Sequence, residues 1–219
     1  IAVANTQITE MIAIDDAGGP VQMVAGLYEQ VFFSLYRNML PIYVDQYPIF
    51  ADARVMPVKV LWDYTFYWGI MCPLVIQRRI LDLPKMSRLQ GRLAGVEQLN
   101  IAVQRLLRQW CAQRGPCGLE TGPPQLLDQA ALDWFAALNA ELFLPLDDAA
   151  FDDRIERSCK GLESLAAEIV AIASADCPAL DGAPVTSLLP PGTIPQAMLF
   201  PAIRRIVSQP LEVTSIEHS

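Results

Sequence analysis

The stretch from residue 54 to residue 76, which reads RVMPVKVLWDYTFYWGIMCPLVI, decides the fold of this protein. Wound as a helix, it carries apolar side chains in nearly every direction and has no wide polar face. Pro57 suits the first turn of such a helix, and Asp52 just upstream can accept hydrogen bonds from its free N–H groups. We therefore predict a central helix that is surrounded by other elements.

The same stretch is apolar enough to raise the question of a membrane-spanning helix. It also contains Lys59 and Asp63, and each charge would cost about 2.5–3.5 kcal/mol at the centre of a bilayer. Pro73 interrupts the run further along. These residues favour a helix buried among other protein elements, so we expect no membrane partner.

Helical periodicity extends to both sides of this stretch, and no alternating strand pattern stands out. We predict helices over residues 1–14, 21–47 with a break at Pro41, 84–113, 125–142, 147–173 and 196–208. The predicted fold is all-α, an irregular helical bundle of about six to seven helices with a Pro-rich C-terminal tail. Residues 1–219 would form a single, mostly helical domain, which the breaker-rich loop 114–124 could divide into 1–115 and 124–219.

Composition and charge exclude several classes of function. The formal net charge of −8 leaves no positive field for a nucleic-acid partner. The only histidine, His218, is the penultimate residue, which argues against His-based catalysis and multi-His metal sites. Cysteines without close CxxC spacing fit reduced thiols, and we expect a cytoplasmic protein.

Lys59 and Asp63 are four residues apart and are therefore neighbours on one face of the predicted central helix. Because burying an isolated charge is costly, each must be satisfied by a partner. Two interpretations stay open: a structural role, as a buried ion pair or through contacts with the backbone of neighbouring loops, or a part in a functional site. Trp62, Tyr67 and Trp68 beside them could likewise be core residues or line a pocket for an aromatic substrate.

The segment 147–153, DDAAFDD, is comparable with the aspartate-rich motifs that hold Mg²⁺ in helical terpene synthases. Alternatively, these carboxylates stand at the N-terminus of a helix, where they cap free N–H groups and complement the helix dipole. Pro145 just upstream and the absence of a second metal-binding motif favour capping. We predict no metal site.

Two segments resemble a known family. Residues 1–12, IAVANTQITEMI, resemble the helix after the flavin-contacting segment of flavin-dependent halogenase-like monooxygenases, which are related to tryptophan halogenases. Residues 54–69, RVMPVKVLWDYTFYWG, resemble a run in the helical C-terminal region of the same family and are the more specific match. The resemblance is confined to the part of the chain before residue 80.

This resemblance implies that the chain is a piece of a longer protein: the substrate-facing, C-terminal portion of a halogenase or monooxygenase that acts on an aromatic or apolar substrate. FAD would be held by an upstream domain, because the family's glycine fingerprint and activating lysine are absent from this sequence. Asn5 and Thr6 would face the flavin at the start of the first helix. By itself the chain is expected to be inactive, with no catalytic residue of its own.

Two other functions stay open. The chain could be a non-enzymatic helical module that binds a partner, or a second copy of itself, through its apolar helices. It could also be a Mg²⁺-dependent prenyl-type synthase built around the segment 147–153.

Overall fold

The computed structural model describes residues 1–114 and 132–195. Within these ranges the chain is helical and contains no strand, which confirms the predicted all-α bundle. The α-helices are α1 (Ala2–Asp16), α2 (Val21–Met39), α3 (Val55–Phe66), α4 (Cys72–Ile76), α5 (Leu83–Arg114), α6 (Asp133–Ala140), α7 (Asp148–Asp176) and α8 (Ala183–Thr186). Short 3₁₀ turns join them: η1 (Leu40–Ile42), η2 (Tyr47–Ala51), η4 (Arg79–Leu81) and η6 (Glu141–Phe143).

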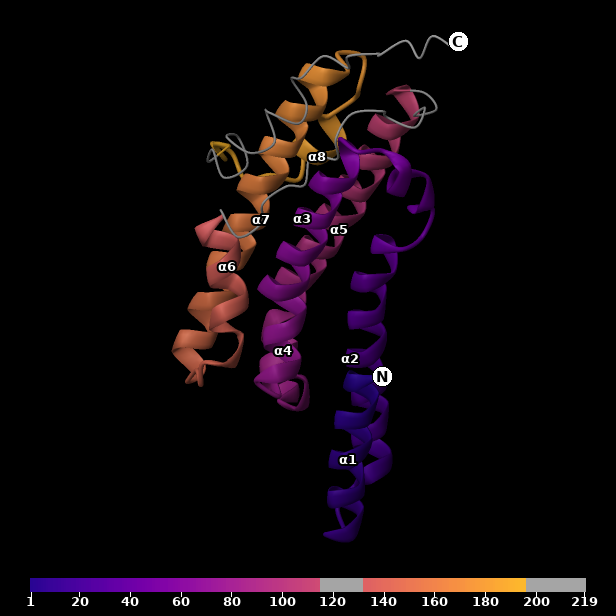
Figure 1. Ribbon diagram of the computed structural model, residues 1–219. Coiled ribbons are helices and arrows are strands. Elements are labelled where there is room, and N and C mark those ends of the chain that lie inside the picture. The colour runs from indigo at the N-terminus through magenta and orange to yellow at the C-terminus, as the bar shows by residue number, and fades with distance from the viewer. Residues whose placement is uncertain (115–131, 196–219) are drawn as a thin grey trace, which may run out of the picture.

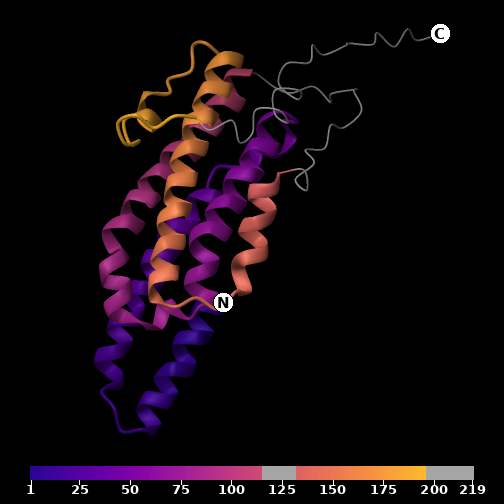
Figure 2. The same ribbon diagram turned by 90° about the vertical axis from the view of Figure 1, so that its left-hand side faces the viewer.

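The core lies where α3, α5 and α7 pack against one another (Figures 1 and 2). One row of α5 at helical spacing is buried along its whole length: Leu89, Leu93, Val96, Leu99, Val103, Leu106, Leu107 and Trp110. Trp62 and Phe66 of α3 meet this row and are fully buried. Residues at helical spacing on facing helices thus form one continuous apolar core.

The stretch 54–76 folds as predicted into one helical run, but its middle is a π-helical turn, η3 (Tyr67–Met71), between α3 and α4. Pro73 explains the irregularity, because proline has no N–H to donate and its ring clashes with the carbonyl four residues earlier in an ordinary α-helix. A wider turn before the proline relieves this clash.

The prediction that this helical run is surrounded on all sides is wrong in part. Tyr64 and Tyr67 remain exposed, because α5, α7 and η2 cover only the other faces of the run. Because the run has apolar side chains on every face, its sequence did not reveal which face would remain exposed to solvent.

Helices α1 and α2 form a hairpin that extends beyond the rest of the bundle in both views (Figures 1 and 2). Gly18 turns the chain with a φ of 71°, a conformation that favours glycine. The predicted break at Pro41 is confirmed, because α2 ends at Met39 and η1 follows. Within α1 only Gln7 is buried, and its side-chain amide donates to the Tyr28 carbonyl oxygen at 3.1 Å.

An ionic cluster closes the opposite end of the bundle. The predicted helix cap is present: Asp52 Oδ1 accepts the backbone N–H groups of Arg54 at 2.9 Å and Val55 at 3.1 Å. Arg114, the last residue of α5, donates from Nε to Asp52 at 3.1 Å and from Nη1 to Asp176 at 2.7 Å. The first residues of α3 and the ends of α5 and α7 are thereby held together.

Several predictions fall outside the described residues. These are the loop 114–124 after Arg114, the helix 196–208 and the first part of the helix 125–142, of which the remainder is α6 and η6. Among the helices that the structure describes, none has the length and apolar character needed to cross a membrane.

Candidate functional site

The buried Lys59 and the partly exposed Asp63 form an ion pair, with Nζ 2.6 Å from Asp63 Oδ2. The other two donors of Lys59 are also used, since Nζ lies 3.0 Å from the Ile42 carbonyl oxygen and 3.1 Å from Gln104 Oε1. Burial lowers the pKa of Lys59 and raises the pKa of Asp63, and each charge partly offsets the shift of the other. The ion pair and the backbone contact of the structural interpretation are both present, and a role of this pair in a functional site stays a prediction.

Trp62 belongs to the same polar network. Its indole N–H donates to Asn100 Oδ1 at 2.8 Å, and Asn100 in turn donates to the Asn38 carbonyl oxygen at 3.0 Å. Gln104 links this group to Asp63 through a 2.6 Å bond from Nε2 to Oδ1. The network locks α3 to α5 and to the end of α2, and its donors and acceptors are directed at one another.

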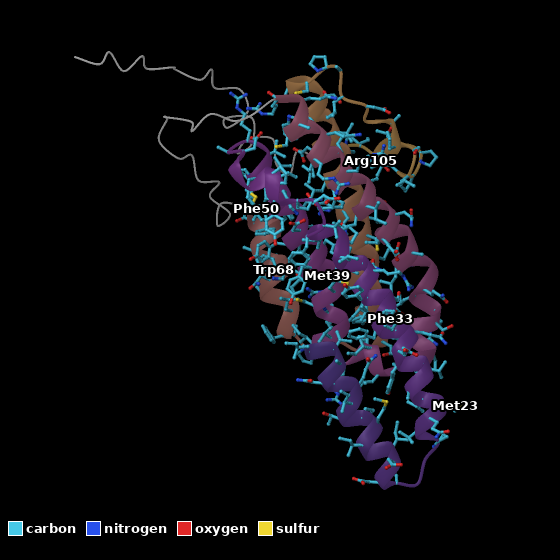
Figure 3. All side chains as sticks on the ribbon, turned by 90° about the vertical axis from the view of Figure 1, so that its right-hand side faces the viewer. Met23, Phe33, Met39, Phe50, Trp68 and Arg105 are labelled. Carbon is cyan, nitrogen blue, oxygen red and sulfur yellow. The ribbon has the colours of Figure 1, made fainter. Side chains whose placement is uncertain are left out.

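Tyr67 and Trp68 lie apart from this network, on the partly open side of α3 and η3. The Trp68 ring packs between Tyr64 and Phe135, with both centroid distances 4.8 Å, and Figure 3 shows Trp68 on the side where α6 passes. Tyr67 lies beside the Cys72 thiol, and burial raises the pKa of that thiol, which favours its neutral form. Of the predicted pocket residues, the polar network joins Lys59, Trp62 and Asp63, whereas Trp68 contacts Phe135 of α6.

Asn5 and Thr6 lie in the first turns of α1. Asn5 is exposed and its carbonyl accepts the Thr9 hydroxyl at 2.9 Å. The helix begins without a side-chain cap and without an acidic residue in its first turn. Their role in binding a cofactor stays a prediction.

The acidic segment 147–153 caps α7, as the capping interpretation predicted. Asp147 Oδ1 accepts the Ala150 N–H at 2.8 Å. The other carboxylates face cations: Asp148 pairs with Arg79, and Asp152 lies 2.9 Å from Lys85 Nζ. Across residues 1–114 and 132–195, no group of three or more metal-ligating side chains is arranged to hold a metal ion.

A pocket of about 170 Å³ opens between η3, α6 and α7. Its walls combine aromatic, aliphatic, hydroxyl and charged side chains with two glycines: Thr65, Gly69, Trp134, Leu138, Glu141, Arg154, Arg157, Ser158 and Gly161. A larger groove of about 580 Å³ between α5 and α7 is lined almost wholly by opposite charges, such as Arg92 and Glu156, whose closest atoms are 3.9 Å apart. We take the smaller, mixed pocket as the candidate site.

Arg154 is the unusual residue of this pocket. It is 3% exposed, and its Nη1 and Nη2 donate to the backbone oxygens of Glu141 at 2.8 Å and Leu138 at 3.0 Å. The Glu141 carboxylate is 3.5 Å away and over a third exposed. Arg154 Nε has no hydrogen-bond partner although it is buried. Such an unpaired buried donor requires an explanation.

Two glycines shape the walls of the pocket. A Cβ on Gly69 would lie 3.2 Å from Ser158 Cβ, so glycine here lets the π-turn approach α7 closely. A Cβ on Gly161 would meet nothing within 4 Å. The pocket is thus tightly closed beside Gly69 and open beside Gly161.

Arg154, Ser158 and the two glycines were not among the site residues predicted from the sequence. A signal was available, because Arg154 falls on the apolar stripe of α7, three residues after Phe151 and four before Ser158. A cation on an inward stripe is a candidate for a special role. No protein-family model, curated protein or solved structure matches this chain.

Proposed function

We propose that this chain is the helical, substrate-facing part of a flavin-dependent monooxygenase or halogenase, and that the pocket between η3, α6 and α7 holds a small aromatic or apolar substrate. The observation that carries the proposal is the pocket, in which Trp134 and Leu138 offer apolar surface beside a few polar groups. The stretch that resembles the family supports it, since this stretch supplies Thr65 and Gly69 to the pocket wall.

The flavin would belong to another part of the natural protein. Bound FAD supplies the oxidising chemistry in such enzymes, and the residues of this chain would bind and orient the substrate and exclude water. Asn5 and Thr6 bring no positive charge to the start of α1, so this helix end alone does not fit the diphosphate of FAD. We assign no reaction step to it.

Benzyl alcohol, a small neutral aromatic probe, tests the pocket. Titrated into the 219-residue chain, it should give saturable heat in calorimetry and change tryptophan emission, because Trp134 lines the pocket. Gly161→Leu should abolish both signals by filling the open space beside Gly161. Gly95→Leu is the matched control, since a Cβ at this exposed position of α5 also meets open space. Equal binding by both variants would contradict the proposal.

The flavin part needs the natural protein. An antibody against this chain should isolate from the source cells a polypeptide that releases FAD on denaturation. A native polypeptide that carries no flavin under any growth condition would contradict a flavoenzyme.

A helical interaction module is a second candidate, and the hairpin favours it. Ile8 and Ile12 of α1 and Phe33 and Tyr36 of α2 are large, apolar and exposed, and Figure 3 labels Phe33 on α2. If these residues bind a second copy, light scattering should show a dimer that dissociates on dilution. Ile8→Glu should then give a monomer, whereas a monomeric wild-type chain would argue against self-association.

A further inference from the structure

Arg154 carries a positive charge that the protein leaves poorly compensated. The nearest carboxylate, on Glu141, is 3.5 Å away and 37% exposed, while the Arg154 side chain is 4% exposed. Its other two acceptors are neutral backbone oxygens. Burial lowers the pKa of Arg154, and the charge of Glu141 offsets this only in part. A buried cation with so little compensation is costly unless an anion joins it.

The unused donors of Arg154 suit a planar anion. Arginine has five N–H donors, and the recorded hydrogen bonds involve only Nη1 and Nη2. The Nε–H has no acceptor, and Nη2 gives one of its two hydrogens to Leu138. Nε–H together with an Nη–H forms the fork that binds both oxygens of a carboxylate.

The rest of the pocket suits an aromatic body. Trp134 and Leu138 give apolar surface, and the open space beside Gly161 leaves room for a flat ring. The Ser158 hydroxyl lies in the same wall and has no hydrogen-bond partner among the described residues. A cavity of about 170 Å³ admits one small ring and not an extended chain.

We infer that this pocket binds a small aromatic carboxylate, with the carboxylate on Arg154 and Ser158 and the ring against Trp134. The inference rests on the proposed function, which gives the pocket a substrate, and it names the class of that substrate. The ligand would supply both the acceptor that Nε lacks and the negative charge that Arg154 lacks.

Three ring compounds of similar size separate the contribution of the ligand's negative charge from that of its planar polar group. Benzoate carries the charge, benzamide keeps the planar group without the charge, and benzyl alcohol lacks both. Calorimetry on the 219-residue chain should show benzoate binding at least about tenfold more tightly than either neutral compound, as expected for a charge-assisted hydrogen bond. Inorganic phosphate should compete poorly, because it has no ring.

Variants at Arg154 locate the effect. Arg154→Met should remove the preference for benzoate while benzyl alcohol still binds, and Arg154→Lys should also weaken benzoate, because lysine lacks the planar fork. Arg105→Met, an exposed change of the same charge on α5 (Figure 3), should leave all affinities unchanged. Circular dichroism and melting curves verify that each variant is folded.

The outcomes separate this inference from the proposed function. If benzyl alcohol binds and Gly161→Leu blocks it, but benzoate binds no better, the inference is wrong and the pocket function stands. If none of the ring compounds binds, both are wrong. Phosphate binding as tight as benzoate would show a general anion site, and wild-type affinity of Arg154→Lys for benzoate would show a point-charge contact; either result overturns the inference as stated.

Discussion

Two arginines with little solvent exposure lie at opposite ends of the bundle and differ in how many carboxylates surround them. Arg114 meets two carboxylates, of Asp52 and Asp176, at 3.1 and 2.7 Å. Burial lowers the pKa of Arg114, but the hydrogen bonds and charges of these carboxylates outweigh it, so the pKa lies above the ordinary value. For Arg154, burial outweighs the single charge of Glu141 and the pKa lies below it.

This difference separates a structural ion cluster from a candidate binding site. Around Arg114 the opposite charges are buried together, and Trp110 completes the cluster by donating to Asp176 Oδ2 at 2.7 Å. Around Arg154 an N–H is left over and a cavity adjoins it. Burial of a charge therefore points to a ligand only where its own surroundings do not balance it.

Replacing each arginine by an apolar residue tests the difference between them most directly. Arg114→Met would leave Asp52 and Asp176 without their cation, and we expect a loss of about 3–5 kcal/mol in the free energy of unfolding. Arg154→Met removes a poorly compensated charge, so we expect a loss of no more than about 1–2 kcal/mol from the backbone oxygens it served. Urea denaturation measures both, and equal losses would contradict the distinction.

Gly69→Ala tests the closed wall of the pocket. The added methyl would press on Ser158, whose Cβ and Oγ lie 3.2 and 3.3 Å from the Cβ position. Since the neighbouring atoms belong to the packed helix α7, we expect a loss of about 1–3 kcal/mol, measured by urea denaturation. Unchanged stability would show that the π-turn moves freely away from α7.

Acid pH should weaken the Arg114 end specifically. Burial raises the pKa of Asp176. The hydrogen bonds from Trp110 and Arg114 lower the pKa by more than burial raises it, so the pKa of Asp176 in the folded protein lies below the ordinary 3.8. The stabilising contribution is therefore complete above the ordinary value and is lost as the pH falls through the folded pKa. Asp176→Asn should be less stable than wild type at pH 7, and this difference should shrink on acidification. Thermal melts from pH 7 to pH 2 provide the measurement, and a constant difference would argue against the assignment.

The smallest expected effect is a gain at the open wall of the pocket. Gly161→Ala should stabilise the protein by about 0.5–1 kcal/mol, because alanine favours the helix and its methyl meets no atom within 4 Å. Gly95→Ala should give a similar gain, since it too lies in a helix beside open space. A loss at Gly161 alone would show that the pocket wall is closed there.

Local features of the sequence determined much of the fold. The end of α2 before Pro41, the cap at Asp52 and the cap at Asp147 depend on residues within a few positions of each other. The buried row of α5 follows from helical periodicity alone. Such features could be predicted because their physical causes, a missing N–H, a nearby carboxylate and a 3.6-residue repeat, are local.

Which charged side chains find enough hydrogen-bond and ion-pair partners depends on the tertiary structure. The sequence placed Lys59 beside Asp63, but Gln104 and the Ile42 carbonyl, which complete the coordination of Lys59, come from other segments. It also gave no measure of how far Arg154 would be from a carboxylate, or of the space beside Gly161. The sequence by itself determined where helices begin, end and turn their apolar faces, because those depend on neighbours along the chain. The pocket depends on how three separate segments pack, and only the folded chain sets those distances.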